Sequence, residues 1–150
     1  MKCPANYPEL ADSILQAVAQ ISTELSISCF ITGGTLLGFY RGDGYIPWHN
    51  DIDVAMIHSH YFQLIDTFYR YGLVSDPFGK HEGRHFWKDD MLLDVHWAKP
   101  EGFYSFQDEL EHNGVIYYTP YPIEEYLEWK YGPTWRTPLR EGEYTLQHEH

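Results

Sequence analysis

FITGGTLLGFYRGDGYIPWHNDIDV, residues 30–54, combines a short apolar strand, a glycine pair and two alternating aspartates. The β-branched and aromatic residues 28–32 predict a strand that ends at Gly33-Gly34, and residues 35–41 predict one or two turns of helix. Glycine lets backbone N–H groups at such a turn approach a phosphate closely. The candidate phosphate- or nucleotide-binding residues are therefore Gly33, Gly34 and Thr35.

Asp51 and Asp53 alternate with Ile52 and Val54 at the end of the same stretch. Because side chains alternate across a strand, we expect the two carboxylates on one face and the two apolar side chains toward the core. Carboxylates on one face repel each other unless a cation lies between them. Mg²⁺ and Mn²⁺ take oxygen ligands, and Mg²⁺ in particular is bound together with substrate phosphates. The pattern favours a metal-bound phosphate; the alternative is a pair of solvated carboxylates at a strand edge.

A third carboxylate, Asp94, lies within the apolar run MLLDVHW, residues 91–97, which is typical of a buried strand. A buried carboxylate is costly unless it is paired or coordinates a metal. If this strand neighbours the one that carries Asp51 and Asp53, the three carboxylates form one cluster. We therefore predict a single metal site made by Asp51, Asp53 and Asp94.

Three residues near these motifs each have two interpretations. Arg41, at the end of the glycine-led helix, is either a phosphate contact or a solvated helix-end cation. His49 and His96 are either outer partners that orient an aspartate or partly buried histidines with ordinary hydrogen bonds. For His96 we favour the second interpretation.

The segments GGTLLGFYR (33–41), YIPW (45–48) and DIDV (51–54), followed later by LDV (93–95), resemble the LicD/fukutin-related family. Tyr126-Leu127 and the pattern from Tyr131 to Pro138 are similar to that family's C-terminal helix and following turn. The resemblance implies an α/β (α+β) nucleotidyltransferase-like fold, with a short mixed β-sheet covered by helices.

The resemblance also implies a reaction. A phospho-alcohol group, such as phosphocholine or a polyol phosphate, would pass from a CDP-linked donor to a hydroxyl acceptor, expected on a glycan. Asp51 and Asp53 would hold the Mg²⁺ or Mn²⁺ that bridges the donor's phosphates. Asp94 would complete the catalytic site and help to deprotonate the attacking hydroxyl.

Two alternatives remain open at this point. A nucleotidyltransferase would use the same carboxylates to transfer NMP from an NTP and would release pyrophosphate. A non-catalytic module would bind a nucleotide without turnover. The second alternative draws on His49-Asn50, which stand where the family often carries acidic residues, and on the short chain.

Composition indicates the kind of protein and its surroundings. The chain has 150 residues and a net charge of −12, which argues against nucleic-acid or anionic-membrane binding. Two cysteines are too few for a disulfide framework, and no apolar run or signal peptide suggests membrane insertion or export. We expect a cytoplasmic protein whose residues 1–150 form one minimal domain, with 141–150 as a loose tail.

Periodicity and turn residues predict the remaining elements. Helices are expected at 8–25, 58–71 and 122–131; strands are expected at 73–75 and 115–118, with a hairpin of 85–88 and 91–97.

The segment HEGRH, residues 81–85, matches the H-E-x-x-H pattern of zinc proteases. That pattern binds zinc only on a helix, which Pro77, Gly79 and Gly83 oppose. We therefore expect His81 and His85 to be ordinary loop residues rather than zinc ligands.

Overall fold

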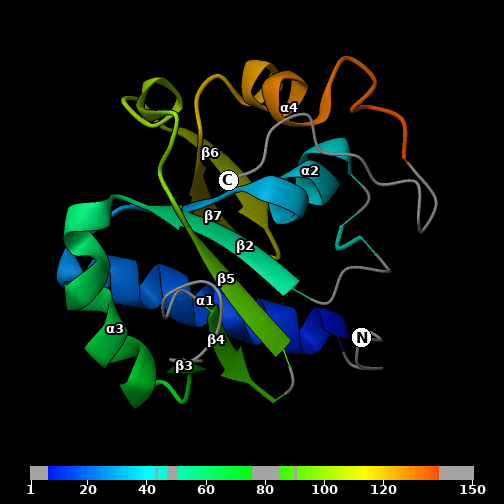
Figure 1. The fold of residues 1–150 in the computed structure, drawn as a ribbon. Coiled ribbons are helices and arrows are strands. Elements are labelled where there is room, and N and C mark those ends of the chain that lie inside the picture. The colour runs from blue at the N-terminus through cyan, green and yellow to red at the C-terminus, as the bar shows by residue number, and fades with distance from the viewer. Residues whose placement is uncertain (1–6, 43, 47–50, 76–84, 90, 139–150) are drawn as a thin grey trace.

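The computed structural model describes residues 7–42, 44–46, 51–75, 85–89 and 91–138 (Figure 1). Its centre is a seven-stranded mixed sheet with the order β3-β4-β5-β2-β1-β7-β6. The strands are β1 (Cys29–Ile31), β2 (Asp51–Met56), β3 (Val74–Ser75), β4 (His85–Lys88), β5 (Met91–Trp97), β6 (Asp108–His112) and β7 (Val115–Thr119).

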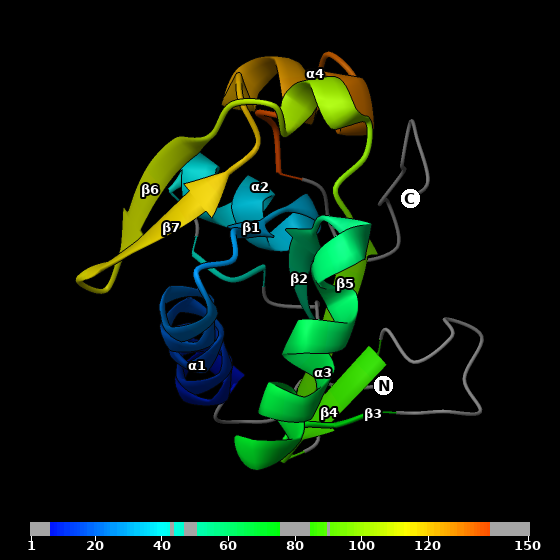
Figure 2. The same cartoon turned by 90° about the vertical axis from the view of Figure 1, so that its left-hand side faces the viewer.

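Helices cover the sheet in two groups. Figures 1 and 2 show α1 (Tyr7–Leu25) and α3 (Tyr61–Arg70) in contact below, and α2 (Gly33–Arg41) and α4 (Ile123–Tyr131) in contact above. The short 3₁₀ helices η1 (His58–His60) and η2 (Glu101–Phe103) precede α3 and follow β5. None of the helices in the described part of the chain combines the length and apolarity needed to cross a bilayer.

Strand β2 carries the alternation that its sequence predicted. Ile52 and Val54 are 0% and 1% exposed and belong to the hydrophobic core, where Val54 faces the same cavity as Leu15 and Val18 of α1. Because successive side chains alternate, Asp51 and Asp53 project from the opposite face. The core therefore fixes which face of the sheet carries the carboxylates.

The sheet also confirms that the two aspartate strands are neighbours. Strand β2 pairs with β5 in parallel, in a register that sets Asp53 opposite Asp94. On its other side, β2 is antiparallel to β1, which leads directly into α2. This arrangement brings the glycine pair and all three aspartates to one region of the molecule.

Most expected elements are present, with some corrections. The hairpin of β4 and β5 has the expected bounds. Helix α2 begins at Gly33 rather than residue 35, so the glycine pair forms its first turn. The expected helix 58–71 is divided into η1 and α3. The expected turn 76–79 and tail 141–150 lie outside the described residues.

Strand β6, with the acidic sequence DELEH, was not predicted. It pairs with β7 around Asn113-Gly114, whose backbones have φ of 51° and 80°. Both residues therefore have the positive φ that a type I′ hairpin turn requires. Charged side chains suit an edge strand, because they discourage its unpaired backbone groups from pairing with another chain.

Candidate functional site

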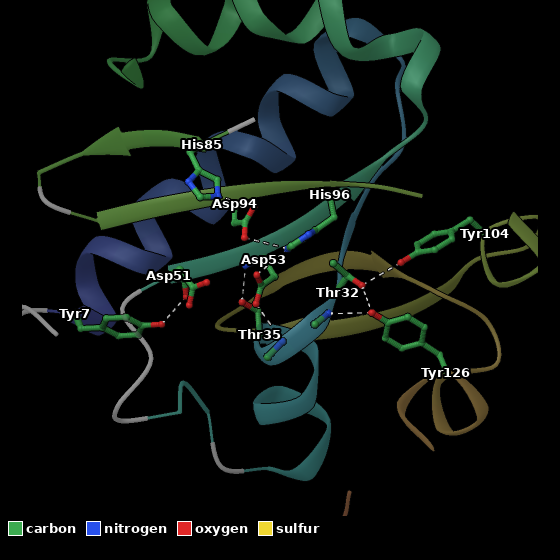
Figure 3. Close-up of polar contacts among 12 residues, drawn as sticks. Tyr7, Thr32, Thr35, Asp51, Asp53, His85, Asp94, His96, Tyr104 and Tyr126 are labelled. Carbon is green, nitrogen blue, oxygen red and sulfur yellow. Dashed lines mark hydrogen bonds and ion pairs between the residues drawn. The ribbon is translucent and has the colours of Figure 1, made fainter. Parts of the chain in front are cut away.

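The start of α2 is bonded to strand β2 through Asp53 (Figure 3). The backbone N–H of Gly34 donates to Asp53 Oδ2 at 3.1 Å. In return, the backbone N–H of Asp53 donates to Thr35 Oγ1 at 2.9 Å. The N-terminus of a helix carries partial positive charge, so the first turn of α2 stabilises the Asp53 carboxylate.

Gly33 is required by the close approach of this helix to the strand. Its φ is +53°, and a β-carbon built on it would lie 3.0 Å from Asp53 Cγ. Its N–H donates to Tyr126 Oη of α4 at 3.2 Å. The glycine pair thus allows α2 to begin directly against a carboxylate, with α4 closing the other side.

Asp53, Asp94 and His96 form the most compact group of ligand atoms in the site. His96 Nε2 lies 2.9 Å from Asp53 Oδ1 and 3.5 Å from Asp94 Oδ2. The three residues offer ligand atoms that all lie within 4.8 Å of one another, so they could hold a metal ion. His96 is 3% exposed and touches both carboxylates, which corrects our preference for an ordinary, partly buried histidine.

Asp51 lies on the same face of β2, although it is outside that compact group (Figure 3). Burial, together with the charges of Asp53 and Asp94, raises the pKa of Asp51 to about 8. Burial and the charge of Asp94 likewise raise the pKa of Asp53 to about 7, against the opposing charge of Lys130. The repulsion expected from the sequence is therefore present among the three aspartates, and a cation would relieve it.

His85 extends the row of polar side chains to a third strand. The register sets His85 of β4 opposite Asp94, and His85 Nε2 lies 3.3 Å from Asp94 Oδ1. The expectation that His85 is a loop residue is therefore wrong, although the motif is not helical at this histidine. Residues 81–84, which complete the H-E-x-x-H pattern, lie outside the described residues.

The other predicted site residues differ in their placement. Thr35 uses its side chain to hold the backbone of Asp53. Arg41 lies at the far end of α2, about 12 Å along the helix axis from Gly33. Its Nη1 donates to the carbonyl oxygen of Trp135 at 3.2 Å. A phosphate contact by Arg41 stays a prediction, and His49 lies outside the described residues.

Sequence reasoning missed a second group of side chains, which adjoins Gly33. Thr32 Oγ1 lies 2.5 Å from Tyr126 Oη and 3.0 Å from Tyr104 Oη. Lys130 is 3% exposed; burial lowers its pKa, while the charges of Asp53 and Asp94 oppose that change. Tyr126 and Lys130 are four residues apart on α4, and this spacing was the available signal that they share a helix face.

Solved structures show the same fold. The crystal structure of ANT(2″)-Ia in complex with adenylyl-2″-tobramycin superposes with a TM-score of 0.57 at 18% identity, covering 72% of this chain and 67% of that one. The solution structure of ANT(2″)-Ia gives a TM-score of 0.58 at 19% identity, covering 75% of this chain and 65% of that one. These similarities confirm the predicted nucleotidyltransferase-like fold.

Curated relatives carry the names of transferases. The ribitol-5-phosphate transferase FKTN of Mus musculus is 26% identical over 165 residues, covering 89% of this chain and 35% of that protein. The lipopolysaccharide cholinephosphotransferase LicD of Haemophilus influenzae is 36% identical over 58 residues, covering 39% of this chain and 22% of that protein. The chain thus spans about a third or less of the length of these relatives.

The family assignment covers the glycine pair, all three aspartates and helix α4. Residues 26–139 match the family described as LicD/FKTN/FKRP, nucleotidyltransferase domain. The chain belongs to the LicD/FKTN/FKRP family.

Proposed function

We propose that this chain is a metal-dependent phosphotransferase that moves a phospho-alcohol group from a CDP-activated donor to an alcohol acceptor, expected on a glycan. The observation that carries the proposal is the contact of Asp53 with Asp94 and His96 beneath the N-terminus of α2. The names of the relatives, a ribitol-5-phosphate transferase and a cholinephosphotransferase, support this choice among reactions of the fold.

The residues present fit a divalent cation. Buried carboxylates that raise each other's pKa, even with Lys130 nearby, form a site with an excess of negative charge, and oxygen donors suit Mg²⁺ or Mn²⁺. Asp53 and Asp94 would hold the ion, with Asp51 as a further carboxylate on the same face of β2 (Figure 3), and His96 would orient the Asp53 carboxylate through its 2.9 Å contact. When bound, such an ion neutralises charge on the phosphate oxygens.

The transfer step forms one bond and breaks one. The acceptor hydroxyl oxygen bonds to the phosphorus that carries the alcohol group. The bond from that phosphorus to the oxygen bridging to CMP breaks, and CMP leaves with the electron pair. Asp94, whose side chain is 13% exposed, would accept the hydroxyl proton. The partial positive charge at the N-terminus of α2 would favour the negative charge of the donor phosphate, while the N–H groups of Gly33 and Gly34 donate to Tyr126 and Asp53.

The test is release of CMP from CDP-choline, CDP-ribitol or CDP-glycerol, with Mn²⁺ and a polyol or glycan acceptor. Asp53→Asn and Asp94→Asn should lower the rate by about 100-fold or more, as loss of one charge-stabilising group does in other active sites. Asp66→Asn makes the same chemical change at an exposed position of α3 and should leave the rate unchanged.

Two results would contradict the proposal. Pyrophosphate release from an NTP, without CMP release, would assign the nucleotidyltransferase reaction to the same carboxylates. Nucleotide binding with neither product would assign the chain as a binding module.

A further inference from the structure

A cavity of about 420 Å³ adjoins the carboxylate site, between the end of β5, η2 and α4. It shares His96 and Gly33 with that site. The remainder of its wall is mostly aromatic and basic, with Trp97, Tyr104, Tyr126, Trp129, Lys99 and Lys130. Its volume lies within the range of pockets that bind small molecules and cofactors. We call this cavity the aromatic pocket.

The aromatic wall is held in place by contacts among its own members. Tyr104 and Tyr126 both bond Thr32, which lies between β1 and α2. The rings of Tyr126 and Trp129 are 6.1 Å apart on α4, and Trp129 also contacts Phe103 of η2 at 5.7 Å. A fixed aromatic wall can stack a planar ring with little loss of conformational freedom on binding.

The pocket also gathers positive charge in an acidic protein. The chain has 10 basic and 22 acidic residues, yet two lysines line this one cavity. Lys130 is buried, and Lys99 is exposed. Lys130 also interacts with the charges of Asp53 and Asp94, and either lysine could pair with a ligand phosphate, whereas a neutral sugar would make no such charge pair. The combination of aromatic rings and lysines fits a ligand with a planar ring and an anionic group.

We infer that the aromatic pocket binds the nucleoside monophosphate part of the donor. The base would stack against the ring of Trp129, and Lys130 would contact the phosphate next to the carboxylate site. The alcohol end of the donor would then lie toward Asp53 and Asp94. This inference rests on the proposed function, because it places the leaving group of that reaction.

The experiment measures binding without turnover. CMP and cytidine are titrated separately into the protein with Mn²⁺, by calorimetry and by tryptophan fluorescence. Lys130→Met, which keeps the length of the side chain, should weaken CMP binding about tenfold or more and leave the affinity for cytidine unchanged. Trp129→Leu should weaken both ligands by a similar factor, and Trp129→Phe should restore them, because any aromatic face can stack a base.

Two further variants control for folding and charge. Lys99→Met changes an exposed lysine at the pocket and should weaken CMP binding without affecting the fold. This variant keeps the test valid if Lys130→Met is unstable. Lys88→Met removes a lysine from β4, which does not line the pocket, and should bind CMP as the wild type does.

The outcomes test the pocket inference and the proposed function separately. The inference is overturned if the wild type binds no CMP, or if Trp129→Leu and Lys99→Met bind CMP as well as the wild type. It is also overturned if these variants raise only the KM of the acceptor, which would make the cavity an acceptor site. CMP binding in this pocket without CMP release would support the pocket inference and contradict the proposed function. CMP release by a protein whose pocket variants bind CMP as the wild type does would support the proposed function and contradict the pocket inference.

Discussion

Gly33 and Asp53 approach so closely that a β-carbon on the glycine would lie 3.0 Å from the carboxyl carbon of the aspartate. Gly42, at the other end of α2, shares the positive φ of Gly33, with +85° against +53°. A β-carbon on Gly42, however, would meet nothing within 4 Å. Substitutions at these two glycines can therefore distinguish the effect of backbone strain, which both share, from the displacement of Asp53, which only Gly33 would cause.

Gly33→Ala and Gly42→Ala should accordingly differ in activity. Both force a β-carbon into the left-handed region and should lower the free energy of unfolding by about 1–2 kcal/mol. Only Gly33→Ala should also displace Asp53 and abolish most CMP release. Urea unfolding and the CMP assay measure the two effects, and equal activity in both variants would contradict this role for the glycine.

Asp53→Asn should separate metal binding from folding. The substitution removes one charge from a repulsive cluster, so the metal-free variant should unfold at the same or a higher temperature than the wild type. Asp51 and Asp94 remain to compensate Lys130. The rise in unfolding temperature on adding Mn²⁺ should be lost, because an ion stabilises only the state that binds it. Asp66→Asn should keep that rise, and an unchanged Mn²⁺ response in Asp53→Asn would exclude it as a ligand.

The stability of the metal-free protein should fall as pH rises between about 4 and 8. The pKa values of Asp51 and Asp53 are raised from 3.8 to about 8 and about 7 in the folded protein. In this window the folded state holds protons that the unfolded state has lost, so the free energy of unfolding decreases with pH.

Urea unfolding at several pH values, with and without Mn²⁺, measures this slope. Excess Mn²⁺ should flatten it, because the ion takes the place of the protons and binds better as they leave. Asp53→Asn should reduce the slope in the metal-free protein. A stability that rises across the window, or a slope unaffected by the substitution, would show that these carboxylates are not held protonated by the fold.

The sequence predicted the carboxylate strands well because alternation is a local property. Residues 51–54 and 91–97 each show which side chains share a face, and both strands formed as expected. The sequence did not show that the two strands would be neighbours, and we could only assume it, because strand pairing depends on contacts between residues far apart in the chain. The register that sets Asp53 opposite Asp94 supplies what the sequence pattern left open.

Other parts of the site depend on the tertiary fold. His96 is two residues from Asp94 on one strand, so the sequence predicts that the two side chains share a face. The contact of His96 with Asp53 depends on the pairing of β2 with β5, which the sequence does not show. Thr32 and Tyr126 are 94 residues apart in sequence, and no local pattern joins them. Strand β6 was missed because its charges outweighed the hairpin signal of Asn113-Gly114.

His81 and His85 should behave differently on substitution, although the zinc pattern treats them alike. His85 lies 3.3 Å from Asp94, so His85→Ala removes a side chain that positions this carboxylate. CMP release should fall by about 10- to 100-fold, as for other outer partners of metal ligands. His81→Ala should leave CMP release unchanged.

Metal analysis of protein purified without a histidine-affinity column decides between the two interpretations. A zinc site on the H-E-x-x-H pattern needs both histidines, so each single variant would lose a stoichiometric zinc ion and the two would have equal effects. The contact with Asp94 instead requires no zinc, and it confines the loss of activity to His85→Ala. Stoichiometric zinc that disappears in both variants would overturn this assignment, because the contact of His85 with Asp94 neither needs a metal ion nor involves His81.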